Sequence, residues 1–195
     1  TQVYSNTGGQ TSTASFKGQD AQMSFHGKVI HGKTERRKEV ANICMMHPDV
    51  FVAQTTAAHT NHFYKAIMAA NEYPGPAVIN VFTTCQPEHG VADDMAMHQA
   101  KLAADSRAFP VFIYYPTKGE RFTERLSLQG NPAKNNDWHV NPKTKEQIDF
   151  IYFAKTEGSF AKHFDKDGKP DKIIQSTQEE RLANWRLLQE LAGEI

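Results

Sequence analysis

The first ten residues, TQVYSNTGGQ, combine side chains that suit the binding of a metal ion or a phosphate group. A Mg²⁺ ion takes about six oxygen ligands, and the hydroxyl of Thr1 and the main-chain carbonyl of Val3 could meet on one side of it. Asn6 carries an amide that donates and accepts hydrogen bonds, while Gly8 and Gly9 would let the backbone approach a bulky anion. On residue types alone, a polar turn with two flexible glycines is the simpler interpretation.

Three apolar runs, and helical patterns before and between them, would position this string. The runs are DVFVAQT (49–55), AVINVF (77–82) and FPVFIYYP (109–116), and the helical patterns cover 34–46, 60–70 and 91–106. Alternation at these spacings is typical of parallel βαβ units, and strands that are apolar throughout are buried on both faces. We therefore expect an α/β fold with a doubly wound, mostly parallel sheet flanked by helices. Ligands of such sheets bind beyond the carboxyl ends of the strands, and the opening string follows a strand-like start at Val3 and Tyr4.

The pattern changes after Pro116, where the chain becomes charged and rich in turns. We interpret residues 1–116 as part of an α/β domain and residues 117–195 as an irregular and helical extension. Within the extension, one helix is expected to begin near Lys143. The last helix would open at a capping box over 176–179 and would be amphipathic. Its apolar stripe would consist of Leu182, Trp185, Leu188 and Leu191.

Charge and cysteine content exclude several classes of function. The 22 basic and 22 acidic residues cancel, so no basic field would attract nucleic acid or an anionic membrane surface. The apolar runs are too short for a transmembrane helix. Cys44 and Cys85 are too few for an iron–sulfur cluster, which needs four thiolates, and they fit a reducing compartment. We expect a cytoplasmic globular protein, or a piece of one.

Three further groups of residues have types that occur in functional sites. His59 and His62 have H-x-x-H spacing, but without additional ligands we interpret them as histidines at a helix end. Cys85 and His89 could form a nucleophile–base pair, yet a thiol that is packed or merely nearby is the favoured interpretation. The basic run RRK at 36–38 is interpreted as a solvated helix face.

Three stretches resemble the thiamine-diphosphate-binding domain of the pyruvate:ferredoxin (flavodoxin) oxidoreductases and other 2-oxoacid:acceptor oxidoreductases. TQVYSNTGGQ resembles that family's T-x-V-Y-S-N-T-G-G-Q element, which is highly specific. YPGPAVINVFTTC is similar to the family's YPGP turn with its following strand and cysteine. FIYFAKTEGSFAKHF is similar to a segment near the end of the family's domain, so the resemblance covers most of the chain, from Thr1 to Phe164.

The resemblance implies specific roles for the opening string. Thr1 through its hydroxyl and Val3 through its carbonyl would bind the Mg²⁺ that holds the diphosphate. Asn6 would lie beside the thiazolium and the substrate as the catalytic residue of this chain. The implied cofactor-binding residues are Thr1, Val3, Tyr4, Ser5, Asn6, Gly8 and Gly9.

The resemblance also implies a larger parent polypeptide. The family's upstream Gly-Asp-Gly element, whose Asp is a further Mg²⁺ ligand, does not occur in this sequence, and neither do the cysteines for [4Fe-4S] clusters. The clusters would be bound by other domains of the parent protein, and this chain alone would be inactive. The intact enzyme would be a homodimer.

The implied reaction is the oxidative decarboxylation of a 2-oxoacid, with pyruvate as the favoured substrate. Coenzyme A would accept the acyl group, and ferredoxin or flavodoxin would accept the electrons. Two alternatives stay open. The first is a non-oxidative thiamine-diphosphate decarboxylase, which needs neither clusters nor coenzyme A, and the second is a non-catalytic α/β module for binding or assembly.

Overall fold

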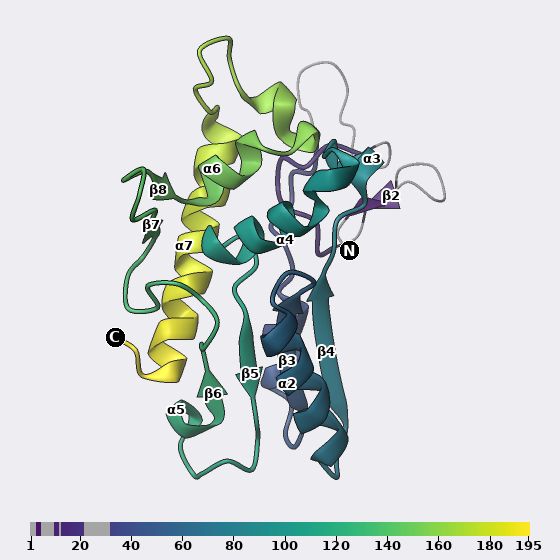
Figure 1. Ribbon diagram of the computed structural model, residues 1–195, viewed down its shortest axis with the longest axis vertical. Coiled ribbons are helices and arrows are strands. Elements are labelled where there is room, and N and C mark those ends of the chain that lie inside the picture. Colours follow the sequence, from purple (N-terminus) through teal and green to yellow (C-terminus); the bar gives the residue numbers. More distant parts are fainter. Residues whose placement is uncertain (1–2, 5–9, 12, 22–31) are drawn as a thin grey trace.

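A computed structural model describes residues 3–4, 10–11, 13–21 and 32–195 of the chain, and its elements are labelled in Figure 1. The central sheet has four strands: β3 (Phe51–Thr56), β4 (Ala77–Phe82), β5 (Phe112–Tyr114) and β6 (Leu126–Ser127). Their spatial order is β4-β3-β5-β6. Helices cover this sheet, so the predicted α/β class is confirmed.

Parallel pairing is confirmed for β3 and β4, which align from Phe51 opposite Ala77 to Thr56 opposite Phe82. The expectation of a parallel third strand is wrong, because β5 runs antiparallel to β3 and β6 runs antiparallel to β5. The preceding helix α4 (Ala96–Asp105) crosses above the strand ends instead of running back along the sheet (Figure 1). The chain therefore enters β5 at the edge of the sheet where β3 ends.

Helices on the two faces of the sheet bury β3 completely. On one face, α1 (Val40–Met45) and α7 (Lys172–Ala192) pack in a cluster with Val52 of β3. On the other face, α2 (Thr60–Glu72) packs with Phe51 and Ala53, and Figure 1 shows α2 in front of β3 and β4. Every residue of β3 is buried, as its apolar run predicts. In β4 only Phe82 is buried, so the expected burial of both faces is wrong for this edge strand.

A third apolar cluster lies beyond the carboxyl ends of β3 and β4. Phe16, from the segment 13–21, packs edge-on against Phe150 with ring centroids 5.1 Å apart. The cluster also includes residues of α4, of α6 (Phe150–Lys155), of the 3-10 helix η3 (Gly158–His163) and of α7. This cluster fixes the segment 13–21 and η3 in place above the sheet.

The helices of the C-terminal region begin at residues that the sequence did not indicate. The pair of strands β7 (His139–Val140) and β8 (Gln147–Ile148) occupies the region near Lys143, and α6 begins only after Asp149, whose carboxylate accepts a hydrogen bond from the Tyr152 amide. Helix α7 begins at Lys172 because Asp171 caps it, accepting from the amides of residues 173 and 174. The predicted capping box at 176–179 therefore lies inside α7.

The interpretation of the basic run at 36–38 as a solvated helix face is wrong. Helix α1 begins at Val40, so the run precedes the helix that was expected over 34–46. Arg37 is buried, with its guanidinium 4.8 Å from the ring centroid of Phe16. Residue-type patterns do not reveal such burial, because the aromatic partner comes from a distant segment. Among the described helices, none has the length and apolarity needed to cross a membrane.

Candidate functional site

The described residues of the opening string lie beside the carboxyl end of β4. They form β1 (Val3–Tyr4) and β2 (Gln10–Thr11), which pair antiparallel. β1 lies against α3 (Gln86–His89), the short helix that follows β4. The backbone of Val3 and Tyr4 is therefore near the sheet edge where ligands of α/β proteins bind. The other predicted site residues, Thr1, Ser5, Asn6, Gly8 and Gly9, lie outside the described residues.

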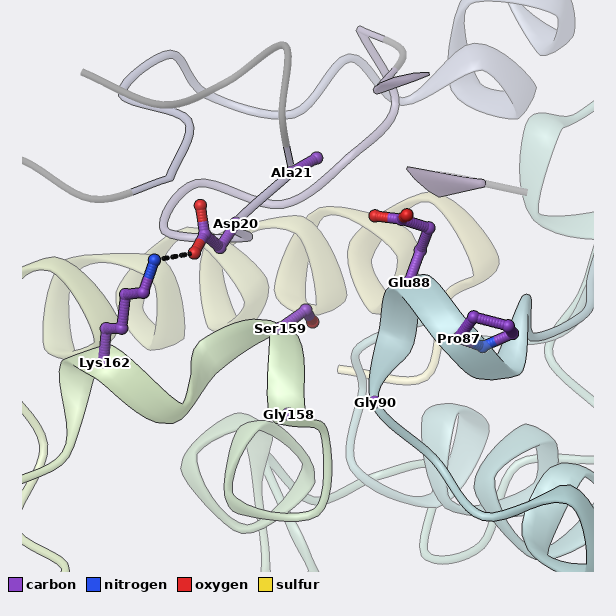
Figure 2. Close-up of a pocket in the computed structure, with 8 residues that line it drawn as sticks. All are labelled: Asp20, Ala21, Pro87, Glu88, Gly90, Gly158, Ser159 and Lys162. Carbon is purple, nitrogen blue, oxygen red and sulfur yellow. Dashed lines mark hydrogen bonds and ion pairs between the residues drawn. The ribbon is translucent and has the colours of Figure 1, made fainter. Parts of the chain in front are cut away.

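A cavity of about 660 Å³ lies between the segment 13–21, α3 and η3. Figure 2 shows Asp20 and Lys162 joined on one side of this cavity, while Glu88 projects from α3 on the other side. Lys162 Nζ donates to Asp20 Oδ2 at 2.5 Å, and Glu88 is the remaining charged side chain among the described lining residues. The remaining lining residues are Ala21, Pro87, Gly90, Gly158 and Ser159. The described lining is therefore acidic and partly formed by backbone.

A buried network centred on Glu157 supports this cavity from behind. One oxygen of its carboxyl group lies 3.2 Å from Nδ1 of His89. The carboxyl group also accepts hydrogen bonds from Gln99 Nε2 at 3.1 Å and from Ser159 Oγ at 3.3 Å. Glu157 is 1% exposed and His89 is fully buried. Buried carboxyl groups need such hydrogen bonds, so the network joins α3, α4 and η3 into one support.

The network also decides how Cys85 and His89 are arranged. Cys85 directly precedes α3, and its carbonyl accepts the His89 amide at 2.9 Å, as in a helical turn. Nδ1 of the buried His89 ring lies 3.2 Å from Glu157 Oε1, while the thiol of Cys85 belongs to a half-buried residue. The sequence did not single out Glu157, although it lies inside the stretch FIYFAKTEGSFAKHF that carries part of the family resemblance.

Two glycines bring the backbones of α3 and η3 into direct contact beside the cavity. Gly90 ends α3 with a φ of 61°, in the left-handed region, and its carbonyl accepts the amide of Gly158 at 3.3 Å. A Cβ atom on Gly90 would lie 2.6 Å from the Cα of Gly158. Gly90 therefore requires glycine on two grounds, its positive φ and this clash, whereas a Cβ atom on Gly158 would lie 3.0 Å from the Cα of Gly90, a tight contact.

The substitution Gly90→Ala is therefore expected to lower the free energy of unfolding by about 2–4 kcal/mol, from backbone strain and the clash together. Urea denaturation of the chain measures this loss. Gly168→Ala is a matched control, because Gly168 has a similar φ of 73° but its Cβ would meet only Lys155 Nζ at 3.8 Å. Equal losses in the two variants would contradict the close contact between Gly90 and Gly158.

His59 and His62 each bond a hydroxyl at the end of β3. Nδ1 of His59 lies 2.8 Å from Thr56 Oγ1, and Nδ1 of His62 lies 3.0 Å from Thr55 Oγ1. Within the described part of the chain, no three histidine, cysteine or acidic side chains gather as a metal site would require. These contacts agree with the interpretation of both residues as histidines at a helix end.

Burial lowers the pKa of His62 from its ordinary value of 6.5 to about 4. Between these two values the unfolded chain binds a proton at this residue and the folded chain does not. The free energy of unfolding should therefore fall as the pH decreases from 6.5 to 4, which thermal denaturation across this range measures. His62→Gln should flatten the decrease, whereas replacement of the exposed His47 by glutamine should not. An unchanged pH profile in His62→Gln would contradict the pKa shift.

Comparisons with characterised proteins agree on one family. The chain is 33% identical over 133 residues to the probable pyruvate-flavodoxin oxidoreductase of Escherichia coli K12, covering 68% of the chain and 11% of that protein. It is 29% identical over 199 residues to the pyruvate-flavodoxin oxidoreductase of Rhodospirillum rubrum, covering 99% of the chain and 15% of that protein. It is 26% identical over 187 residues to the pyruvate synthase subunit PorB of Thermotoga maritima, covering 95% of the chain and 51% of that subunit.

No protein-family model matches the chain. The chain spans at most about half the length of these three relatives, and a much smaller part of the two oxidoreductases. The matches nevertheless cover most of the chain and agree with the resemblance carried by its opening string. The chain belongs to the family of the pyruvate-flavodoxin and pyruvate:ferredoxin oxidoreductases.

Proposed function

We propose that this chain forms one wall of the thiamine-diphosphate site in a larger 2-oxoacid:acceptor oxidoreductase that acts on pyruvate. The observation that carries the proposal is the position of β1 against α3, beyond the carboxyl end of β4. That position is where α/β sheets bind ligands, and it belongs to the string with the most specific family resemblance. The names of the relatives supply the substrate, pyruvate, and the acceptors, flavodoxin and ferredoxin.

The charges around the described cavity restrict where each part of the cofactor would bind. Among the described lining residues, Glu88 has no cation to balance it and Lys162 is paired with Asp20, so this part of the lining would repel a diphosphate. We therefore assign Mg²⁺ and the diphosphate to the opening string, with the Thr1 hydroxyl and the Val3 carbonyl as ligands. The acidic cavity would accept a neutral or cationic group instead.

Thiamine diphosphate, when bound, supplies the electron sink for decarboxylation of a 2-oxoacid. This chain would hold the cofactor and orient the 2-oxoacid. The amide of Asn6 would orient the 2-oxoacid, and Tyr4, Ser5, Gly8 and Gly9 would line the cofactor with main-chain groups. Coenzyme A, the [4Fe-4S] clusters and the docking of ferredoxin or flavodoxin would involve other parts of the parent protein, which we propose is a cytoplasmic homodimer.

Anaerobic reduction of a viologen dye by the complete protein tests the proposed function. Pyruvate, oxaloacetate and 2-oxoglutarate would be supplied in turn, each with and without coenzyme A. Reduction that requires both pyruvate and coenzyme A is the expected result. A protein that holds thiamine diphosphate and its clusters, yet reduces the dye with none of these acids, would contradict the proposal.

The role of Asn6 gives a sharper prediction. Asn6→Ala in the complete protein should lower kcat/KM for pyruvate on the order of 100-fold, as expected when one preorganised hydrogen-bonding group is removed from an active site. Binding of thiamine diphosphate, followed by fluorescence quenching, should change far less. Asn71→Ala, at an exposed residue near the end of α2, is the control and should keep full activity. Full activity in Asn6→Ala would exclude Asn6 from the site.

A further inference from the structure

A second cavity, of about 490 Å³, lies between α2, β5 and β6. It is also lined by α5 (Phe122–Arg125) and by the turn that joins β5 to α5. Figure 1 shows α5 and β6 at the lower end of the molecule, away from α3, and the two cavities share no described lining residue. The volume is in the range of sites that hold small organic molecules, about 300–1,000 Å³. The chemistry of the lining indicates which kind of molecule would fit.

Two exposed lysines, Lys65 of α2 and Lys118 of the turn, give this cavity its charge. The other charged lining residues, Glu124 and Arg125, have opposite charges, and both bond the backbone of the turn. Glu124 Oε2 accepts from two amides of the turn at 2.9 Å, and Arg125 Nε donates to a carbonyl of the turn at 3.0 Å. Within the part of the chain that the structure describes, neither lysine has an ion-pair or hydrogen-bond partner. Two positive charges are therefore available to a ligand, on a turn and a helix that are already fixed.

His62 of α2 lines the same cavity without adding to its charge. Burial, together with the nearby charge of Lys65, lowers the pKa of His62 to about 4, so the ring is neutral near pH 7. Its Nδ1 lies 3.0 Å from the hydroxyl of the fully buried Thr55, which fixes the ring against β3. Its Nε2 is buried and has no hydrogen-bond partner among the described residues. Buried polar atoms usually have such a partner, and a ligand group that reaches this ring would supply one.

The uncharged part of the lining includes a rigid apolar surface. Ile113 of β5 and Tyr115, which follows β5, are both half-buried in this wall. The ring of Tyr115 packs edge-on against Phe51 and against Tyr73, with centroids 5.5 Å apart in each pair. These two contacts hold the Tyr115 ring in one orientation. A flat apolar group could pack here without a rearrangement of the protein.

We propose that this cavity binds a phosphate monoester with a flat apolar body. Near pH 7 such a phosphate carries about 1.5 to 2 negative charges, which matches the two lysines. Its oxygens would accept charge-assisted hydrogen bonds from Lys65 and Lys118, while the apolar body would pack on Ile113 and Tyr115. A carboxylate has a single charge and would leave one lysine unbalanced. The proposal concerns ligand binding at this cavity and does not depend on the proposed reaction.

Isothermal titration calorimetry of the complete protein tests the ligand class, with 1-naphthyl phosphate as the probe and thiamine diphosphate present throughout. Three related molecules each lack one feature: 1-naphthoate has a single charge, inorganic phosphate has no apolar body, and 1-naphthol has no charge. The probe should bind about tenfold more tightly than any of them, because it alone uses both lysines and the apolar surface. Equal affinity for 1-naphthoate would assign the cavity to carboxylates and would overturn the proposal, as would a lack of binding by the probe.

Substitution and hydrogen–deuterium exchange test the place of binding. Lys65→Gln and Lys118→Gln should each weaken binding about tenfold, the effect of losing one charge-assisted hydrogen bond. Lys143→Gln, at an exposed lysine between β7 and β8, is the matched control and should bind the probe like the wild type. The probe should slow amide exchange in residues 117–130 and leave residues 86–90, at the other cavity, unchanged. Unaltered affinity in both cavity variants, or protection of 86–90 alone, would overturn the proposal.

Discussion

Replacement of Glu39 by glutamine is expected to lower the free energy of unfolding by about 3–5 kcal/mol, the usual cost of removing one partner from a buried ion pair. Glu39 Oε1 lies 2.5 Å from Arg181 Nη2, and Oε2 lies 3.2 Å from Arg37 Nε. Arg181 is fully buried and Arg37 is 5% exposed. Without the carboxylate, two guanidinium groups would stay buried beside each other with no anion between them.

The pKa values of Arg37 and Glu39 are set by the opposing effects of burial and of the neighbouring charges. Burial lowers the pKa of Arg37 to about 10, because the protein interior disfavours its charge. Burial alone would raise the pKa of Glu39, but the nearby charges of Arg37 and Arg181 outweigh that effect and lower it. A carboxyl group with a lowered pKa stabilises the fold above its unfolded pKa, near 4.5, and loses that contribution as the pH falls through its folded pKa.

Urea denaturation near pH 7 measures the loss in Glu39→Gln. The matched control is Glu190→Gln, on an exposed surface of α7, which should change stability by less than about 0.5 kcal/mol. As the pH falls below about 4.5, the difference between the wild-type chain and Glu39→Gln should shrink, because the unfolded wild-type chain then binds a proton at Glu39 that the folded chain, with its lowered pKa, does not. Equal stability of the two variants at pH 7 would contradict the role of Glu39.

Replacement of Trp185 by alanine should be comparably destabilising, by about 3–5 kcal/mol, the range for a buried aromatic residue. Trp185 is fully buried where α7 packs on the sheet, in a cluster with Val52 and Phe112. Its ring lies under the guanidinium of Arg107, with the Cζ atom 4.0 Å from the ring centroid. Its indole N–H donates to the carbonyl of Asn136 at 2.8 Å. Alanine would remove these contacts and leave a cavity.

Trp185→Phe separates the packing contribution from the hydrogen bond. Phenylalanine keeps an aromatic ring for Arg107 and loses the donor to Asn136, so a smaller loss of about 1–2 kcal/mol is expected. Thermal denaturation followed by circular dichroism measures both variants. A loss in Trp185→Phe as large as in Trp185→Ala would show that the hydrogen bond, and not the packing, dominates at this position.

Several elements of the fold follow from short stretches of sequence. The apolar runs locate β3, β4 and β5, and the helical period between them locates α2 and α4, because hydrophobic periodicity reflects how each element faces a core. The opening string led to the family because its order of residues is specific to one binding element. The locations of the short helix α6 and the long helix α7 also follow from the sequence, whereas their first residues were predicted wrongly.

Strand direction depends on contacts that local patterns do not contain, whereas the starts of α6 and α7 are set by the local caps Asp149 and Asp171. Ser176, the first residue of the predicted capping box, lies inside α7 and accepts a hydrogen bond from Lys17 at 2.9 Å. The direction of β5 follows from the course of α4 across the strand ends. That direction appears only in the pairing of β5 with β3, which brings Val52 opposite Tyr114 from a distant part of the sequence.

The amino-acid order alone thus determined the class of fold, the principal strands and the family, since each depends on neighbouring residues or on a contiguous string. Tertiary structure decided which polar groups are buried together. The carboxyl group of Glu157 contacts the side chains of His89, Gln99 and Ser159. Arg37, from the basic run at 36–38, is buried near the charge of Arg181. The physical reason is that desolvation and hydrogen bonding depend on atoms brought together from distant positions, which no local pattern of residue types records.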